Sequence, residues 1–183
     1  MATIEEWNER YRSGDTAGMA PSPVVVRAAA LSTPGRALDV ACGTGRNTIF
    51  LARHGWEVVA IDGADEAIRR LRESAERESL SVDTALVDLE REPIQYPAGS
   101  FDLIVITHYL QRDLFPIAAE LLRPGGLCAV AVRLIDVSSG GKSRNQRYRI
   151  APGELRRLFE TWIAVDYREE NGVAEIMARR AES

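Results

Sequence analysis

The amino-acid sequence predicts a Rossmann-like α/β fold: a seven-stranded mixed sheet with one antiparallel strand near its edge and helices on both faces. Three observations predict this class. Short apolar runs alternate with segments of helical period, a glycine turn follows the first run, and Asn171 and Gly172 join the last two runs as a favoured hairpin turn. Alternating strands and helices require right-handed crossovers and a mainly parallel sheet, whereas the hairpin forces one strand to run antiparallel.

Two helices are expected ahead of the sheet. Thr3 and Glu6 have the spacing of a capping box that opens the first helix. Ser22 as a cap and Pro23 in the first turn open the second helix. Residues 14–21 form a loop between them, so this region adds two helices to an otherwise complete α/β core.

We treat residues 1–183 as a single domain, because no linker and no internal repeat divides the sequence. Residues 1–33 form its N-terminal helical cap and residues 34–183 its Rossmann-like core. The cap either packs against the core or folds over a ligand. We expect residues 7–21 to act as a lid.

The expected strands of the core are rich in apolar and β-branched residues. They span residues 37–40, 56–61, 82–87, 101–106, 127–132, 162–167 and 174–178. The intervening helices carry an apolar stripe, and they span residues 47–54, 65–77, 113–122 and 152–159. Pro124 and the two glycines after it end the third of these helices, and Pro152 lies in the first turn of the fourth.

Composition narrows the functional class. The net charge of −4 argues against a nucleic-acid surface, and no apolar run reaches the ~20 residues that span a bilayer. Acidic residues near the N-terminus do not fit a signal peptide, so we expect a cytoplasmic protein without membrane contact. Cys42 and Cys128 are too few for a disulfide framework, or for a zinc site without help from the two histidines, and we expect buried thiols and no metal.

The glycine turn is the central motif. After the first strand the chain passes through Gly43 and Gly45 and enters a helix, whose N-terminus attracts an anion. A dinucleotide fits such a turn, but Thr48 replaces the third glycine of that fingerprint. Asp39, inside the strand before the turn, would repel a pyrophosphate. Its carboxylate suits instead the ammonium group of an amino acid.

Two further aspartates follow the next two strands. Asp62 ends the second strand, where an acid accepts hydrogen bonds from both hydroxyls of a ribose. Asp88 ends the third, where a carboxylate can accept from an exocyclic amine such as that of adenine. Each alone is open to interpretation as a turn or helix cap. Together with Asp39 at the carboxyl edge of a parallel sheet, they describe an amino acid, a ribose and an adenine, which is S-adenosylmethionine.

At this point the sequence resembles the class I methyltransferases. The resemblance rests on residues 38–45, on Asp62, on Asp88 with Leu89, and on residues 101–104 and 121–126. Ala41 stands where the family more usually has a glycine. A narrower resemblance, to the tellurite-resistance and thiopurine-type methyltransferases, rests on residues 7–11, 45–47 and 153–159, whereas residues 138–143 depart from it.

The resemblance implies the site residues. The expected contacts to S-adenosylmethionine, and to its product S-adenosylhomocysteine, are Tyr11, Asp39, Ala41, Gly43, Gly45, Asn47, Asp62, Gly63, Asp88, Leu89 and Thr107. The acceptor is expected beyond the fourth strand, with His108 and Tyr109 as the catalytic candidates. His108 is a base or a packed residue; Tyr109, like Tyr11 or Trp7, packs in the core or faces the cationic sulfonium.

The expected activity is methyl transfer to a small molecule, namely a thiol, a chalcogen oxyanion such as tellurite, or a heterocycle. Three alternatives stay open: a catalytically silent protein that binds the cofactor, a methyltransferase acting on a macromolecule, and a nicotinamide-dependent oxidoreductase. The basic residues 142–149 form a solvated loop or contact an anion. Arg112, Arg133 and Arg147 steer an anionic acceptor or form surface ion pairs, and the protein is expected as a monomer or homodimer.

Overall fold

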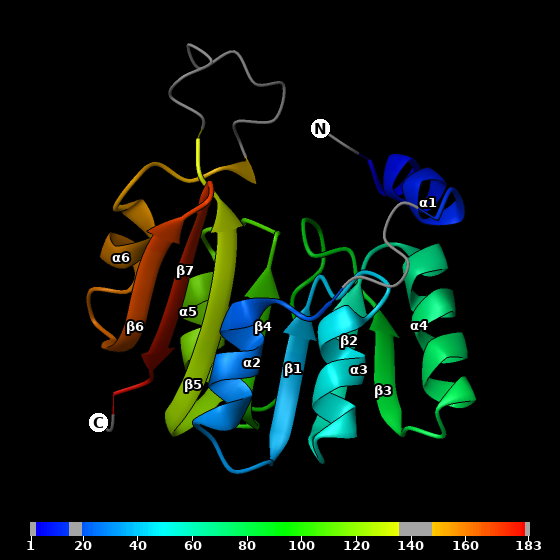
Figure 1. The fold of residues 1–183 in the computed structure, drawn as a ribbon, viewed down its shortest axis with the longest axis horizontal. Helices are drawn as coiled ribbons and strands as arrows, with labels where there is room; N and C mark the ends of the chain where they lie inside the picture. Colours follow the sequence, from blue (N-terminus) through cyan, green and yellow to red (C-terminus); the bar gives the residue numbers. More distant parts are fainter. Residues whose placement is uncertain (1–2, 15–19, 136–147, 182–183) are drawn as a thin grey trace.

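The computed structural model describes residues 3–14, 20–135 and 148–181, and within them one sheet has seven strands. The strands are β1 (Arg36–Val40), β2 (Glu57–Asp62), β3 (Val82–Leu86), β4 (Phe101–Thr107), β5 (Leu122–Arg133), β6 (Ile163–Glu170) and β7 (Val173–Arg179). Their order is β3-β2-β1-β4-β5-β7-β6, and β7 runs antiparallel to both neighbours (Figure 1). The predicted fold class is therefore confirmed.

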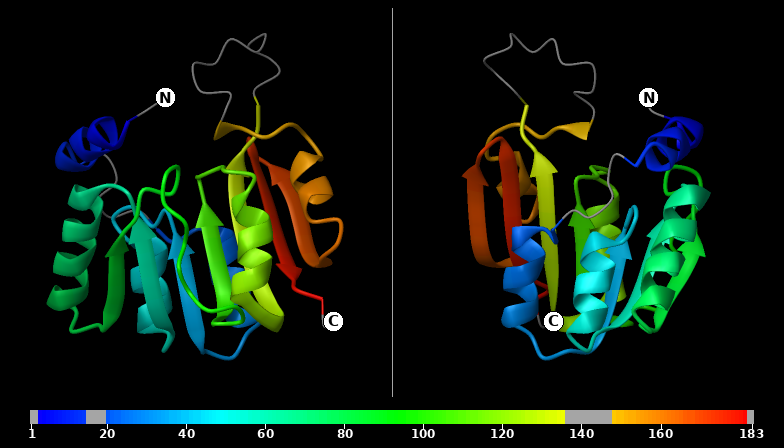
Figure 2. Two further views of the ribbon diagram at one scale, coloured as in Figure 1. Left: turned by 180° about the vertical axis from the view of Figure 1, so that it is seen from behind. Right: turned by 45° about the vertical axis from the view of Figure 1, so that its right-hand side comes forward.

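The described residues form six helices, most of which cover the two faces of this sheet. They are α1 (Ile4–Arg12), α2 (Pro23–Ala30), α3 (Arg46–Arg53), α4 (Asp65–Arg77), α5 (Leu114–Leu121) and α6 (Glu154–Leu158). Figures 1 and 2 show α2, α3 and α4 on one face and α5 and α6 on the other. This is the arrangement that right-handed crossovers between parallel strands produce. None of the helices in the described ranges is long and apolar enough to cross a bilayer.

The core forms because successive residues of each strand face opposite layers. In β1, Leu38 packs on the side of α5 and Ala37 on the side of α2, and both are fully buried. Burial of a leucine side chain contributes about 1.5–3 kcal/mol, so the apolar runs of the central strands hold the carboxyl edge of the sheet in place. The functional residues project from this edge.

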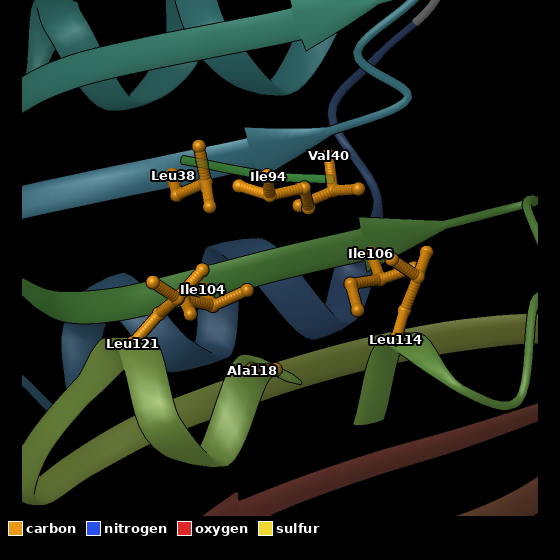
Figure 3. Close-up of a pocket in the computed structure, with 8 residues that line it drawn as sticks. All are labelled: Leu38, Val40, Ile94, Ile104, Ile106, Leu114, Ala118 and Leu121. Carbon is orange, nitrogen blue, oxygen red and sulfur yellow. The ribbon is translucent and has the colours of Figure 1, made fainter. Parts of the chain in front are cut away.

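A small apolar gap lies between core side chains. It measures about 10 Å³, which is room for a single water. Figure 3 shows the side chains that border it between β1, β4 and α5: Leu38, Val40, Ile94, Ile104, Ile106, Leu114, Ala118 and Leu121. A gap of this size without polar groups is a packing defect of the core.

Two local predictions were wrong and a third was confirmed. Ser22 is the N-cap residue of α2 and Pro23 lies in its first turn, as predicted, although Ser22 Oγ accepts from Arg46 Nη2 at 3.0 Å and makes no cap hydrogen bond. Pro152 lies outside α6, because Gly153 with φ of 73° is the cap and the helix begins after it. The strand expected over residues 127–132 begins at Leu122, which pairs with Phe101 before the register shifts.

The two N-terminal helices occupy different places. In α2, Val24, Val25 and Ala28 are fully buried against the sheet, so this helix belongs to one of the covering layers. In contrast, α1 lies above the carboxyl edge, next to α4 (Figure 1). The capping box of α1 is present as predicted, with Thr3 and Glu6 each bonded to the other's backbone.

Candidate functional site

The glycine turn lies at the carboxyl end of β1 and has the backbone that glycine permits. Gly43 and Gly45 both have positive φ, of 55° and 86°, and Gly45 is the N-cap of α3. A Cβ on Gly45 would lie 2.2 Å from Leu71 Cδ1 of α4, so a larger residue there would force the Leu71 side chain to move. The turn thus leaves the N-terminus of α3 and its backbone N–H groups facing the edge of the sheet.

Ala41, at the entrance of this turn, has a φ of 54°. A side chain in this left-handed region costs about 1–2 kcal/mol, which gives a physical reason for the glycine more usual at this position. The next residue, Cys42, donates its backbone N–H to Ile61 O at 3.0 Å. The strained residue is therefore held between two regular pairings with the neighbouring strand.

Asp62, the last residue of β2, holds two loops together. Its Oδ2 accepts the backbone N–H of Gly43 and its Oδ1 that of Ala64, both at 2.8 Å. The side chain is buried, and desolvation raises the pKa of this carboxyl although the backbone N–H groups oppose the rise. A carboxylate oxygen has two lone pairs, so these bonds leave acceptor capacity for a ligand.

Asp39 is buried near the carboxyl end of β1. Its Oδ2 accepts from Thr48 Oγ1 at 2.6 Å, across the turn from α3. Burial raises the pKa of Asp39 to about 7, against the hydrogen bond from Thr48 and the positive charge of Arg46. The carboxyl therefore titrates near neutrality, and a cationic group placed beside it would favour the ionised form.

Asp88 lies two residues beyond the end of β3 and caps a turn. Its Oδ1 accepts the backbone N–H of Glu90 at 3.1 Å, and its Oδ2 lies 3.7 Å from Arg91 Nε. Asp88 therefore has the turn-capping role that the sequence left open for it. Leu89 beside it is buried, and its carbonyl accepts from Gln111 Nε2 at 3.1 Å.

Asn47 and Thr107 are bonded to each other. Asn47 Nδ2 donates to Thr107 Oγ1 at 2.9 Å, and Asn47 Oδ1 accepts the backbone N–H of Ser22 at 2.9 Å. Both side chains are buried. They tie the start of α2, the start of α3 and the end of β4 together just behind the glycine turn.

The two catalytic candidates follow β4. His108 is exposed, with a φ of 58°, and its backbone N–H donates to Ala131 O at 2.7 Å. Partial desolvation of the ring, then the charges of Arg46 and Arg133, lower its pKa to about 4 against the opposing charge of Glu175. The imidazole is therefore neutral at pH 7.

Tyr109 is half-buried and donates through Oη to Gln111 Oε1 at 2.8 Å. Desolvation raises the pKa of its phenol, so the hydroxyl keeps its proton at neutral pH. Because Gln111 also donates to the carbonyl of Leu89, it connects the loop after β4 with the loop after β3.

Tyr11 of α1 reaches the glycine turn from above. Its side chain is buried, and a Cβ on Gly43 would lie 3.1 Å from its hydroxyl. Trp7 stacks on the Tyr11 ring with centroids 5.9 Å apart. Gly63, in the loop after β2, has Ile4 of α1 within van der Waals distance of the position of a Cβ.

The basic residues that the sequence singled out add little to the described site. Arg112 forms an ion pair with Glu154 at 2.5 Å, which is the surface role considered for it. Arg147 and the predicted loop over residues 142–149, apart from Tyr148 and Arg149, lie outside the described residues, and so do residues 15–19 of the predicted lid. Arg149 lies within them and donates from Nη1 to Leu134 O at 2.9 Å.

Comparison with known proteins identifies the family. A family model described as "Tellurite resistance protein TehB" matches residues 7–179. The chain belongs to the TehB family. Over 157 residues it is 31% identical to the probable S-adenosyl-L-methionine-dependent methyltransferase TehB of Haemophilus influenzae, covering 81% of this chain and 53% of that protein. This confirms the resemblance to the tellurite-resistance methyltransferases.

Solved structures agree on the fold. TehB from Haemophilus influenzae superposes with a TM-score of 0.76 at 25% identity, covering 97% of this chain and 66% of that one. The N-methyltransferase NodS from Bradyrhizobium japonicum, in complex with S-adenosyl-L-homocysteine, also has a TM-score of 0.76, at 20% identity and full coverage of both chains. The chain spans about half the length of the curated TehB relatives it matches.

The structure of this TehB-family chain also contains a site residue that sequence reasoning missed. Asn8 of α1 is 4% exposed and bonds to Asp65 and to the backbone of Glu66 at the start of α4. Its position between Trp7 and Tyr11, four residues after Ile4, was the available signal, because residues at that spacing share one helix face.

Proposed function

We propose that this chain binds S-adenosylmethionine at the carboxyl edge of its sheet and transfers the methyl group to a small-molecule acceptor. The observation that carries the proposal is the arrangement of Asp39, Asp62 and the glycine turn. Two buried carboxyls flank a turn with glycine at two positions and a helix N-terminus. The cofactor presents an ammonium, a carboxylate and a ribose, which match these groups in charge and in hydrogen bonding.

Each part of the site has a proposed role. Gly43 and Gly45 offer backbone N–H groups to the carboxylate of the methionine moiety, and Asp39 accepts from its ammonium. Asp62 accepts from the ribose hydroxyls with its remaining lone pairs, since its two backbone hydrogen bonds already orient it. The turn of Asp88 and Leu89 borders the adenine.

When bound, S-adenosylmethionine would supply a methyl group activated by its sulfonium: a lone pair of the acceptor would bond to the methyl carbon as the carbon–sulfur bond breaks and S-adenosylhomocysteine leaves. The chain then has to align the two partners and exclude water, which can lower the barrier by up to ~7–11 kcal/mol. Tyr11 of α1 contributes by covering the turn from the solvent side. His108 and Tyr109 border the space beyond β4 in which the acceptor is proposed to lie.

The state of His108 supports one class of acceptor. With a pKa of about 4, its imidazole is a weak proton acceptor, whereas an efficient general base has a pKa near the working pH. A thiolate or a chalcogen oxyanion attacks with a lone pair and loses no proton. We therefore favour these acceptors over an alcohol, and the name of the TehB family is consistent with an oxyanion.

Calorimetric titration with S-adenosylhomocysteine tests the proposal. We expect micromolar binding, no comparable binding of NAD, and at least tenfold weaker binding of Asp62→Asn, because hydrogen bonds to a carboxylate contribute about 1.5–3 kcal/mol. Asp83→Asn, an exposed aspartate within β3, is the matched control and should bind normally. Absence of binding to the folded wild type would refute the proposal. If the wild type binds, transfer of a labelled methyl group to thiols or oxyanions would identify the acceptor.

A further inference from the structure

One face of α1 contacts the candidate site at three successive points. Ile4, Asn8 and Tyr11 are spaced by four and three residues, so they lie along one side of the helix. Ile4 packs against Gly63 in the loop after β2, and Tyr11 packs against Gly43 in the loop after β1. Asn8 lies between them and is the most buried residue of the three.

Asn8 supplies a cap that α4 lacks. The N-cap position of α4 is Ala64, which has no side chain able to accept from the first backbone N–H groups. Asn8 Oδ1 accepts the backbone N–H of Glu66 at 3.1 Å, and Asn8 Nδ2 donates to Asp65 Oδ1. A residue 58 positions away thus performs the task of a local cap.

A second contact fixes the other end of α1. Arg70 Nη2 donates to the carbonyl of Arg12 at 3.2 Å, and Arg70 Nε is held by Glu66 Oε1 at 2.9 Å. Glu66 therefore takes part in both attachments, through its backbone to Asn8 and through its carboxylate to Arg70. Because α4 begins three residues after Asp62, these contacts also position the loop that carries Asp62 and Gly63.

We propose that Asn8 is a positioning residue for cofactor binding: by capping α4 from outside, it docks α1 so that Ile4 and Tyr11 close over Gly63 and Gly43. The inference rests on the proposed function, since it assigns these loops to the cofactor. Asn8 acts through the loops and need not contact the ligand. Loss of its two hydrogen bonds should therefore weaken cofactor binding without unfolding the sheet, to which α1 contributes no strand.

A donor–acceptor exchange tests this role. Asn8→Leu removes both hydrogen bonds, and Asn8→Asp keeps the acceptor for Glu66 N–H but places a carboxylate against Asp65. In the double variant Asn8→Asp with Asp65→Asn, the side-chain amide at position 65 donates to the carboxylate at position 8, so the hydrogen bond is restored with its direction reversed. Glu9→Ala, at the neighbouring exposed position of α1, is the matched control. Each variant is measured by calorimetric titration with S-adenosylhomocysteine, by thermal unfolding, and by trypsin cleavage after Arg10 and Arg12 without ligand.

We expect about tenfold weaker binding for Asn8→Leu and for Asn8→Asp, with faster cleavage of α1 and a nearly unchanged unfolding midpoint of the core. The double variant should regain wild-type affinity and protection from trypsin. Unchanged affinity of Asn8→Leu, or failure of the double variant to recover, would overturn the inference. If the wild type does not bind, the proposed function fails, and trypsin cleavage still decides whether Asn8 docks α1.

Discussion

Burial changes the acid–base behaviour of the Asp39 side chain strongly. A carboxyl with a pKa of about 7 exists as a mixture of both forms at neutral pH. Its burial favours the protonated form, whereas Thr48 and Arg46 favour the charged one. The ammonium of the proposed cofactor would favour the charged form as Thr48 and Arg46 do, so cofactor binding and ionisation of Asp39 should be linked.

The same shift predicts the pH dependence of stability. The pKa of Asp39 is raised from ~3.9 in the unfolded chain to about 7, so the folded state holds the proton more tightly between these values. The free energy of unfolding should therefore fall as pH rises from 4 to 7. Relative to Asp39→Asn, the wild type should lose about 2–4 kcal/mol over this window, measured by urea denaturation. A constant difference between the two proteins would contradict the assignment.

Single residues divide clearly between those that sequence could place and those it could not. Asp39 and Asp62 lie at the strand ends where the sequence predicted them, because carboxyl ends of parallel strands share one edge. The bond between Asn47 and Thr107 joins residues 60 positions apart, so no local pattern encodes it. The spacing of Asn8 places it on one helix face with Ile4 and Tyr11, but its partners at the start of α4 lie 57 and 58 positions away and no local pattern names them.

At the level of whole elements, the close approach of α3 to α4 explains why the turn needs a glycine. The N-cap of α3 is Gly45, and Leu71 of α4 packs directly against it. Both helices also contribute to one apolar cluster with Ile49 and Ile68. The turn therefore needs a glycine for two reasons, its left-handed φ and the missing space for a Cβ.

Comparison of two glycines separates these reasons. Gly45→Ala should lower the free energy of unfolding by about 2–4 kcal/mol, because the Cβ adds overpacking against Leu71 to the left-handed strain. Gly172→Ala has a similar φ of 74° with nothing near the new Cβ, and should cost only about 1 kcal/mol. Both are measured by urea denaturation; equal losses would show that contact with Leu71 has no effect.

Element types were predicted well and their ends less well. The bounds of α4 match the prediction, because its apolar stripe is continuous and acidic residues open it. The predictions failed at Pro152 and at the start of β5. The backbone N–H of Gly153, the cap of α6, donates to Glu169 Oε1, and Leu122 pairs with Phe101, so partners distant in sequence compete with the local signal. A cap or a proline indicates that an element begins nearby, and packing selects the residue.

Across the whole molecule, the two N-terminal helices are attached with very different strength. The apolar residues of α2 are buried in the core, and Arg27 joins it to Glu175 of β7 at 2.6 Å and to Asp166 of β6 at 3.3 Å. The attachment of α1 rests on the side chains that meet α4 and the two loops. We therefore expect α1 to be dispensable for folding and necessary for tight binding of the cofactor.

Deletion of residues 1–20 tests this difference. The shortened chain should keep its far-ultraviolet circular dichroism and unfold in one transition, while its affinity for S-adenosylhomocysteine falls by tenfold or more. Val25→Asp in α2 is the contrasting variant and should unfold the protein, because it buries a charge in the core. Unchanged affinity of the deletion variant would refute the expected lid over the site.

The sequence by itself determined the fold class, the glycine turn and the edge of the sheet that carries the acidic residues. Each of these follows from local period, from glycine's freedom at Gly45, or from the rule that parallel strands end on the same side. Only the tertiary structure decided how the edge is held: Asp62 across two loops, Asn47 against Thr107, and Asn8 as the cap of α4. Those bonds join residues distant in sequence, and their geometry exists only once the layers have packed.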